Sequence, residues 1–361
     1  MSAADHFSNS YAEAREKFCA AAAAAGGALR SWHNPKVKGP GGENLYLDTA
    51  RLGSPDARRM LVLVSGTHGV EGFCGSGAQI NWLRSGGPAA LPAGTGALLV
   101  HAINPYGFAW VRRVNEDNVD LNRNFVDHAK PYPANAGYHD IADALKPPRW
   151  DDASLAEAQQ SIASFVQKNG AFGYQQAVTG GQYSHPDGLF FGGHAPVWSN
   201  RAIREIIRTE LGHCTRIAVI DFHTGLGPFG HGEIICVSPP GTSGFDRTRQ
   251  WYGDQVTSPE QGTSTSAIVV GVMIDAFPQE APDAEVTAVA IEYGTYPVLE
   301  VLQAVRQDNW LHMHGDLASS QGKEMKAYIR ERFYPAGAKW AEMVWARAHD
   351  VIGMAQRGLS A

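Results

Sequence analysis

Four short apolar segments, separated by stretches with helical patterns, limit what this 361-residue chain can fold into. The segments are Met60–Val64, Ala97–Ile103, Arg216–Asp221 and Thr287–Glu292. Each is a nearly continuous run of Val, Leu, Ile, Met and Ala, which is typical of a strand buried on both faces. Such strands alternating with helices predict an α/β fold with a mixed, mostly parallel central sheet and helices on both faces.

The rest of the chain predicts a single catalytic domain over residues 1–361. An alanine-rich helix is expected at about residues 10–25, and the chain from about 297 to 357 is expected to be helical and to pack on the same domain. Two short alternating segments, Leu29–Trp32 and Asn44–Thr49, are expected as edge strands. We find no internal repeat and no long linker in the sequence.

Composition excludes several classes of partner. The net charge is −6 with acids and bases mixed along the chain, so a nucleic-acid partner is not expected. The sequence holds no apolar run of about eighteen residues and no basic start before an apolar stretch, so no membrane partner and no secretion signal are expected. Four scattered cysteines without a C-x-x-C pair suit reduced thiols. The sequence therefore predicts a cytoplasmic protein.

Polar side chains with metal-binding or proton-transfer chemistry follow three of the four apolar segments. The first segment leads into His68 and Glu71, the third into His223, and the fourth ends at Glu292. In open α/β sheets, ligands bind outside the carboxyl ends of the strands, so these four side chains are expected to lie near one another.

Two histidines and one carboxylate are the protein ligands of many catalytic zinc sites, with a fourth position left open. An H-x-x-E pair such as His68/Glu71 matches often by chance, and a lone histidine is usually a satisfied core or surface residue. Taken alone, the pair therefore supports a metal site only weakly.

A further motif makes the pattern much more specific. About fifty residues after H-x-x-E, residues 119–125 read Val-Asp-Leu-Asn-Arg-Asn-Phe, and a strand-end His and a strand-end Glu follow in that order. This order resembles the funnelins, the carboxypeptidase-A-like zinc metallopeptidases, including their bacterial members of unassigned function. The resemblance spans most of the chain and implies a carboxypeptidase-like fold with one Zn²⁺ per chain.

The resemblance implies a role for each strand-end residue. His68, Glu71 and His223 correspond to the zinc ligands. Glu292 corresponds to the carboxylate that activates the attacking water and passes its proton to the leaving amine. General chemistry supports the role of Glu292, because a carboxylate within hydrogen-bond reach of a zinc-activated water can act as a general base.

The resemblance also implies how substrate is held. Asn122 and Arg123 correspond to the pair that grips a free carboxylate, and a planar guanidinium is a natural bidentate partner for that group. Arg113 corresponds to the arginine that polarises the scissile carbonyl, where a cation stabilises the developing oxyanion. Arg112 remains an alternative for this last role, because the loop is shorter than in the digestive enzymes.

Two departures from the family pattern remain open. Asp221 precedes His223 by two residues, and this D-x-H element is similar to the aspartoacylase and succinylglutamate desuccinylase branch. Asp221 either orients the His223 ring or is an ordinary strand-end acid. The tyrosine that covers substrate in classical carboxypeptidases has no clear match, and Tyr252, Tyr293 and Tyr296 are all candidates.

The sequence thus predicts a zinc-dependent hydrolase that cleaves an amide bond next to a free carboxylate. A metallocarboxypeptidase acting on small peptides is the first reading, and an N-acyl amino acid deacylase is the alternative. A nucleotide-binding protein is disfavoured because Ile80 stands where the last glycine of G-x-G-x-x-G would be. A serine hydrolase is disfavoured because Ser65, Ser76 and Ser243 lack the G-x-S-x-G context. A non-catalytic binding protein would be expected to lack a ligand or the base. No oligomeric state is predicted.

Overall fold

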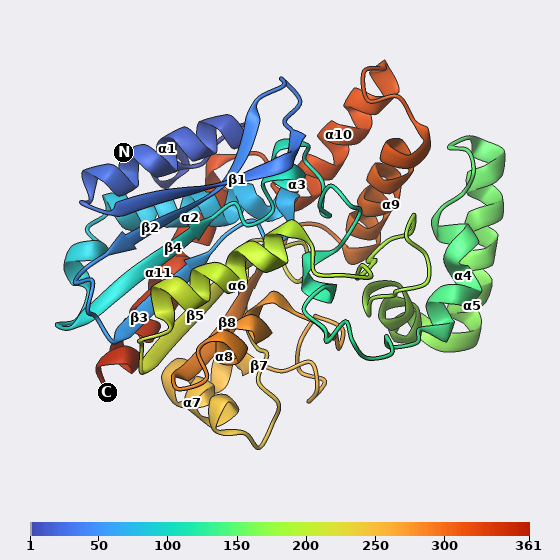
Figure 1. Cartoon of the computed structure of the whole chain (residues 1–361). Helices are drawn as coiled ribbons and strands as arrows, with labels where there is room; N and C mark the ends of the chain where they lie inside the picture. Colours follow the sequence, from blue (N-terminus) through green and yellow to red (C-terminus); the bar gives the residue numbers. More distant parts are fainter. Residues whose placement is uncertain (1) are drawn as a thin grey trace.

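The computed structural model describes residues 2–361, and the strands in this part of the chain form one mixed sheet (Figure 1). The strand order is β1-β2-β4-β3-β5-β8-β6-β7. In the centre, β4, β3, β5 and β8 run parallel. β2 pairs antiparallel with β1 and β4, and β6 pairs antiparallel with β8 but parallel with β7. The bounds are β1 Ala28–Lys38, β2 Asn44–Leu52, β3 Arg59–Val64, β4 Thr95–His101, β5 Arg216–Thr224, β6 Gly232–Cys236, β7 Val256–Thr257 and β8 Glu285–Tyr293.

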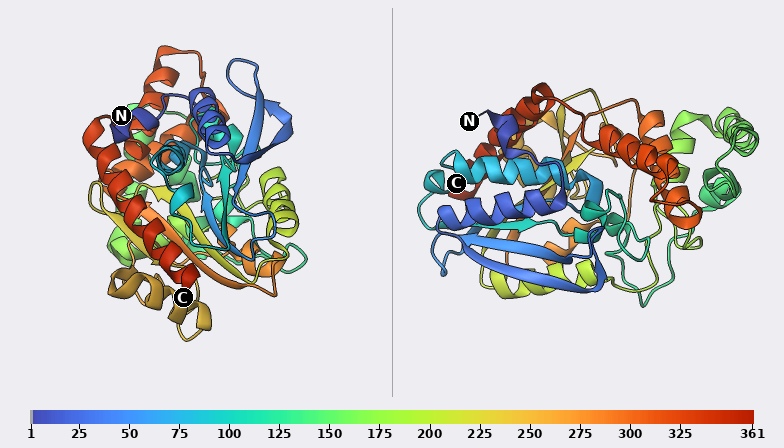
Figure 2. Two further views of the ribbon diagram at one scale, coloured as in Figure 1. Left: turned by 90° about the vertical axis from the view of Figure 1, so that its left-hand side faces the viewer. Right: turned by 90° about the horizontal axis from the view of Figure 1, so that it is seen from above.

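Helices cover both faces of this sheet, as Figure 2 shows. α2 and α11 lie on one face, with α1 beside α2, and α6 lies on the other. The mixed, mostly parallel sheet expected from the sequence is therefore confirmed. The helices are α1 Tyr11–Ala24, α2 Gly72–Arg84, α3 Pro105–Ala109, α4 Ala136–Leu145, α5 Asp152–Thr179, α6 Trp198–Leu211, α7 Ser243–Tyr252, α8 Ala276–Glu280, α9 Val298–His314, α10 Ser320–Phe333 and α11 Ala338–Ser360.

The alternation of side chains along β3 explains why this strand is apolar throughout. Leu61 and Leu63 point to the face covered by α2 and α11. Val62 and Val64 point to the opposite face, where they belong to the same core cluster as Ile203 of α6. Full burial of each such side chain contributes about 1.5–3 kcal/mol to stability, so both faces favour apolar residues.

A second group of helices lies beyond the carboxyl ends of the parallel strands (Figure 1). α4, α5, α9 and α10 share a separate core cluster, which includes Tyr138, Tyr174, Val301 and Phe333. α5 runs as far as Thr179 and contains a kink at Gly170, where φ is +78°. This group forms one wall of the space above the strand ends.

Of the two segments expected to form edge strands, the first does and the second does not. The segment around Leu29–Trp32 is β1, which forms an edge of the sheet. The segment around Asn44–Thr49 is β2, which pairs with β1 on one side and β4 on the other. Its alternating sequence resembles that of an edge strand because polar Asp48 and Thr49 are buried in β2, where Arg15 of α1 pairs with the Asp48 carboxylate.

Within residues 2–361, none of the helices combines the length and the apolar character needed to cross a membrane. The four cysteines are all free thiols, and three of them are buried.

Candidate active site

The register of the central strands brings the predicted site residues to one edge of the sheet. On parallel strands β5 and β8, His223 lies directly beside Glu292. On β3 and β5, Val64 lies beside Asp221, so the chain that leaves β3 passes close to His223. Residues far apart in the sequence therefore meet above the carboxyl ends of three adjacent strands.

His68 and Glu71 are held in a tight turn between β3 and α2. Gly69 lies so close to the backbone of Gly107 that a Cβ would come within 2.0 Å of it, so a side chain at this position would not fit. The Gly69 amide donates to the carbonyl of Arg113 at 3.1 Å. The turn is thus fixed against the segment that carries Arg113.

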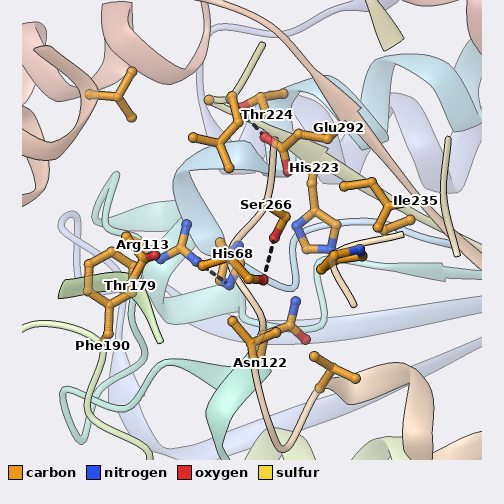
Figure 3. A pocket seen from close by; sticks show the side chains of 18 of the residues that line it. His68, Arg113, Asn122, Thr179, Phe190, His223, Thr224, Ile235, Ser266 and Glu292 are labelled. Carbon is orange, nitrogen blue, oxygen red and sulfur yellow. Dashed lines mark hydrogen bonds between the residues drawn. The ribbon is translucent and has the colours of Figure 1, made fainter. Parts of the chain in front are cut away.

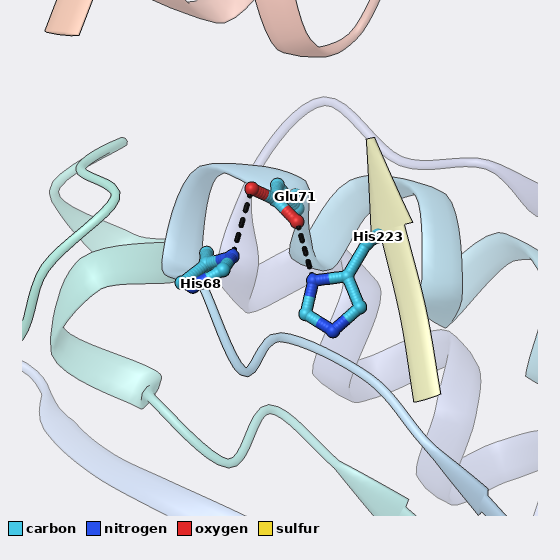
Figure 4. A group of neighbouring side chains, drawn as sticks. All are labelled: His68, Glu71 and His223. Carbon is cyan, nitrogen blue, oxygen red and sulfur yellow. Dashed lines mark hydrogen bonds and ion pairs between the residues drawn. The ribbon is translucent and has the colours of Figure 1, made fainter. Parts of the chain in front are cut away.

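Three side chains converge as a candidate metal centre (Figure 4). His68 Nδ1 lies 2.9 Å from Glu71 Oε1, and His223 Nδ1 lies 2.9 Å from Glu71 Oε2. All three residues are buried, and one ligand atom from each lies within 4.8 Å of the others. Two imidazole nitrogens and one carboxylate at this spacing fit the protein ligands of a catalytic zinc ion.

Carboxylates bind the other nitrogen of each imidazole. His68 Nε2 lies 3.1 Å from Asp120 Oδ1, and His223 Nε2 lies 2.8 Å from Asp221 Oδ2. His68 Nε2 also lies 2.9 Å from Arg113 Nη2. Thr67 Oγ1 donates to Asp221 at 2.9 Å. Such carboxylate–histidine pairs fix the ring so that Nδ1 faces the metal position.

Burial and neighbouring charges act in opposite directions on these groups. Burial raises the pKa of Glu71, but His68 and His223 outweigh it and hold that pKa well below its usual value. Burial also raises the pKa of Asp120, and the charge of Arg113 outweighs it, so this pKa too is low. Both carboxylates are therefore ionised at neutral pH, which suits a cation-binding site.

Glu292 faces the same space from β8. The backbone amide of Leu226 donates to Glu292 Oε1 at 3.0 Å, which orients the carboxylate. Burial, together with the negative charge of Glu71, raises the pKa of Glu292 to about 8. A carboxyl group with this pKa is suited to accept and return a proton near neutral pH.

The two neighbouring arginines point in different directions. Arg113 donates from Nη1 to Glu71 Oε1 at 3.0 Å and from Nε to Asp120 Oδ2 at 2.9 Å. Arg112 is buried elsewhere and donates from Nε to Asp308 Oδ2 at 3.2 Å. The structure therefore places Arg113, and not Arg112, beside the candidate metal centre.

Asn122 and Arg123 line the same pocket. Arg123 donates from Nη1 to the Asn122 carbonyl at 2.8 Å and from Nη2 to the carbonyl of Thr179. Its Nε is buried and has no hydrogen-bond partner in the described part of the chain. Asn122 Oδ1 accepts from the amide of Met273 at 2.9 Å. An orphaned buried donor of this kind is costly unless a ligand supplies an acceptor.

The pocket that joins these groups has a volume of about 960 Å³, including its open mouth (Figure 3). The charged side chains at its base are His68, Arg113, Arg123, Asp221, His223 and Glu292. Its walls are mostly apolar and include Ile235, Val237, Ala267, Val269, Val301 and Leu302. An apolar cavity with a few convergent polar groups is the usual form of a small-molecule site.

Of the three tyrosines considered as a cover for substrate, two are core residues. Tyr252 and Tyr293 are fully buried among apolar side chains. Tyr296 lines a neighbouring cavity and hydrogen-bonds through its hydroxyl to Glu331. Tyr296 alone among the three lies at a cavity next to the site.

A family model described as protein of unknown function (DUF2817) matches residues 7–347. The chain belongs to this family. No curated protein matches it.

Several solved structures are similar to this DUF2817 member. Carboxypeptidase A from Helicoverpa armigera is 14% identical, with 89% of this chain and 73% of that chain covered and a TM-score of 0.42. Murein-tripeptide amidase MpaA from Escherichia coli O157 is 14% identical, with 82% and 91% covered and a TM-score of 0.36. A protein described as a succinylglutamate desuccinylase/aspartoacylase family member, from Shewanella amazonensis, is 16% identical, with 79% and 72% covered and a TM-score of 0.37.

One residue of the DUF2817 site was not assigned a role from the sequence. Asp120 contacts His68 and Arg113, and its Oδ1 also accepts from the Asn122 amide at 3.0 Å. It stands inside the Val-Asp-Leu-Asn-Arg-Asn-Phe motif, two residues before Asn122. Its position in that motif is the signal by which it could have been found.

Proposed function

We propose that the chain is a zinc-dependent hydrolase that cleaves an amide bond next to a free carboxylate, acting as a metallocarboxypeptidase on small peptides. One observation supports the proposal most strongly: a single pocket is lined by both imidazoles of the candidate metal centre, by the Glu292 carboxyl group and by the buried Arg123, whose Nε has no partner in the described part of the chain. Each of these groups has a place in amide hydrolysis.

The metal would be held by His68, Glu71 and His223, at one Zn²⁺ per chain. When bound, zinc supplies a Lewis acid that polarises the scissile carbonyl and brings the pKa of a water molecule toward neutrality. The carboxylates of Asp120 and Asp221 orient the two imidazole rings so that each Nδ1 faces Glu71 and the proposed metal position.

Glu292 is the proposed general base and acid. The amide of Leu226 holds one of its carboxylate oxygens, and the group lies in the same pocket as His68 and His223. It takes one proton from the attacking water and passes it to the nitrogen of the leaving amine, so the C–N bond breaks to a neutral amine and a carboxylic acid. The acid then releases the second proton of the water to solvent and becomes a carboxylate.

Arg123 and Asn122 are proposed to hold the carboxylate of the substrate, and Arg113 to stabilise the oxyanion. Arg123 lines the pocket and offers a carboxylate next to the scissile bond a cationic partner. Arg113 lies against Glu71 and Asp120 at the pocket, where most of its side chain is buried and its charge can stabilise a developing negative charge.

An N-acyl amino acid deacylase is the second candidate, and the Asp221–His223 contact favours it. The D-x-H element that provides this contact is similar to the aspartoacylase branch, and the structure shows the Asp221 carboxylate bound to the ring. Both candidates use the same metal ligands, base and carboxylate anchor. They differ in the group on the acyl side of the bond.

Replacement of Glu292 tests the proposed chemistry. Glu292→Gln keeps the size and the hydrogen bond from Leu226 but cannot accept the water's proton. We expect unchanged zinc content and circular dichroism, with turnover of peptides and N-acyl amino acids reduced by about 10²–10⁴-fold. A variant that retained most of the wild-type rate would show that another group is the base.

A further inference from the structure

A second cavity adjoins the pocket just described and belongs to no step of the proposed chemistry. Its volume is about 980 Å³, including open solvent, and it shares Leu226 and Val298 with the main pocket. Its other lining residues are Gln175, Gly227, Pro228, Phe229, Thr265, Thr295, Tyr296 and Pro297. We call these ten residues the outer groove.

The outer groove meets the main pocket beside Glu292, because Leu226 lines both cavities. In Figure 3, His68 and His223 lie between Asn122 at one end of the pocket and Glu292 at the other. Leu226, which lines the groove, donates its amide to Glu292. A substrate whose carboxylate sits at the anchor and whose amide bond sits at the metal centre would therefore extend its acyl side into the groove.

Two of the segments that line the groove, residues 226–229 and 295–298, are tied together by backbone contacts next to them. The Gly230 amide donates to the Gly294 carbonyl at 2.9 Å, and the Gly294 amide donates to the His231 carbonyl at 3.0 Å. A Cβ on Gly294 would come within 1.9 Å of the Pro228 carbonyl oxygen, so the segments touch here. A groove fixed in this way loses little conformational entropy when a ligand binds.

The chemistry of the groove favours neutral peptide residues. All of its lining residues are uncharged, and Phe229 leaves 45% of its surface exposed at the rim. The Thr295 hydroxyl is buried and has no hydrogen-bond partner in the described chain. The nearest cation, Arg332, lies 4.2 Å from the centroid of the Tyr296 ring and is already paired with Glu300 at 3.0 Å. A carboxylate-bearing acyl group such as succinyl would therefore lose its hydration here without gaining an unpaired cation, and an acetyl group would leave the groove unfilled.

We propose that the outer groove binds the two or so residues on the amino side of the scissile bond, so that the substrate is a neutral peptide of at least three residues. This proposal rests on the proposed function and selects the peptidase reading over the deacylase reading. Phe229 and Tyr296 supply apolar contact surface, and the Thr295 hydroxyl supplies a hydrogen bond to the peptide.

The test compares three probes with the same carboxyl-terminal leucine, chosen because the main pocket has apolar walls. They are N-acetyl-leucine, N-succinyl-leucine and the tripeptide acetyl-Gly-Phe-Leu. Dissociation constants are measured by calorimetry with zinc-loaded Glu292→Gln, and kcat/KM with the zinc-loaded wild type. We expect the tripeptide to bind and react at least tenfold better than either acyl-leucine.

Two variants locate the effect. Phe229→Ala should reduce the tripeptide's advantage several-fold in both binding and kcat/KM. Phe172→Ala is the matched control, because Phe172 is an exposed phenylalanine on α5 that lies outside both cavities. It should leave the advantage unchanged.

The outcomes separate this proposal from the proposed function. Equal binding and rates for the tripeptide and N-acetyl-leucine, or a preference for N-succinyl-leucine, would overturn the groove proposal and leave the hydrolase intact. An unchanged advantage in Phe229→Ala would also overturn it. Failure of all three probes to bind would overturn both.

Discussion

At the scale of single residues, the carboxylates of Asp120 and Asp221 position the two imidazoles of the candidate metal centre. Each histidine has one nitrogen facing Glu71 and the other held by an aspartate. This arrangement fixes the orientation of both rings, with Nδ1 facing Glu71. Orientation by an outer carboxylate typically strengthens metal binding by about 10–100-fold.

This arrangement predicts a graded loss of zinc. His223→Ala removes a ligand and should abolish stable zinc binding, whereas Asp221→Asn keeps the ligand and should weaken affinity by about 10–100-fold. Metal analysis and titration against a chelator measure both variants. Wild-type zinc occupancy in His223→Ala would count against the ligand assignment.

The order of motifs predicted the residues around the metal centre but could not decide between two arginines. His68, Glu71, His223 and Glu292 follow strands whose register is set by apolar patterns, so their meeting could be foreseen. The direction of the Arg113 side chain depends on the path of a loop, which spacing does not encode. Asp120, in contrast, stands inside the motif, and its position there could have indicated a role.

At the scale of elements, the segment that carries Arg113 is held by helices from the end of the chain. Val111 has a φ of +52°, an unfavourable conformation for a β-branched residue. Lys326 of α10 donates to the Val111 carbonyl at 2.8 Å and also pairs with Asp308 of α9. Arg112 contacts the same aspartate. These buried contacts offset the backbone strain and set the position of Arg113.

Loss of the Lys326 side chain should therefore reduce turnover, because the backbone at Val111 would move and displace Arg113. Lys326→Met should lower kcat on free-acid peptides, and adding Val111→Gly should restore part of it, because glycine adopts positive φ without strain. Lys323→Met on the exposed side of α10 is the control. Thermal unfolding of each variant distinguishes a general loss of stability from a specific loss of turnover. A double variant no better than Lys326→Met would show that strain at Val111 is irrelevant.

The start of α2 was the element that the local sequence predicted least well. α2 begins within a glycine-rich stretch, which helix propensity disfavours. A Cβ on Gly75 would lie 2.6 Å from Ser65 Cβ, and one on Gly77 would lie 2.5 Å from the Phe7 ring. The helix is glycine-rich because it packs closely, a tertiary cause that the local sequence does not reveal.

At the scale of the whole molecule, the sheet and its covering helices give a rigid base for the site. Their core also buries His101, which stacks on Phe18 with ring centroids 4.4 Å apart and has its Nε2 2.9 Å from Ser76 Oγ. Burial lowers the pKa of His101 to about 4. The folded protein therefore holds this ring neutral where an unfolded chain would protonate it.

The stability of the molecule should consequently fall in mild acid. Between the unfolded pKa of 6.5 and the folded pKa of about 4, the unfolded state binds the extra proton, so the free energy of unfolding decreases as pH falls. The full effect of this one group is roughly 3 kcal/mol below pH 4. Urea unfolding of His101→Gln between pH 7 and 4 should show a shallower decline, and the exposed His213→Gln should not. Identical pH dependence in all three proteins would exclude His101 as a cause.

The selection of a free carboxylate is the central claim, and one pair of substrates tests it most directly. A short neutral peptide with a free carboxyl terminus is compared with the same peptide as its carboxyl-terminal amide, using zinc-loaded wild type and Arg123→Ala. The account predicts that the wild type strongly prefers the free acid. It also predicts that Arg123→Ala loses about 2–5 kcal/mol of transition-state stabilisation on the acid and changes little on the amide. Equal kcat/KM on acid and amide in the wild type would contradict the account.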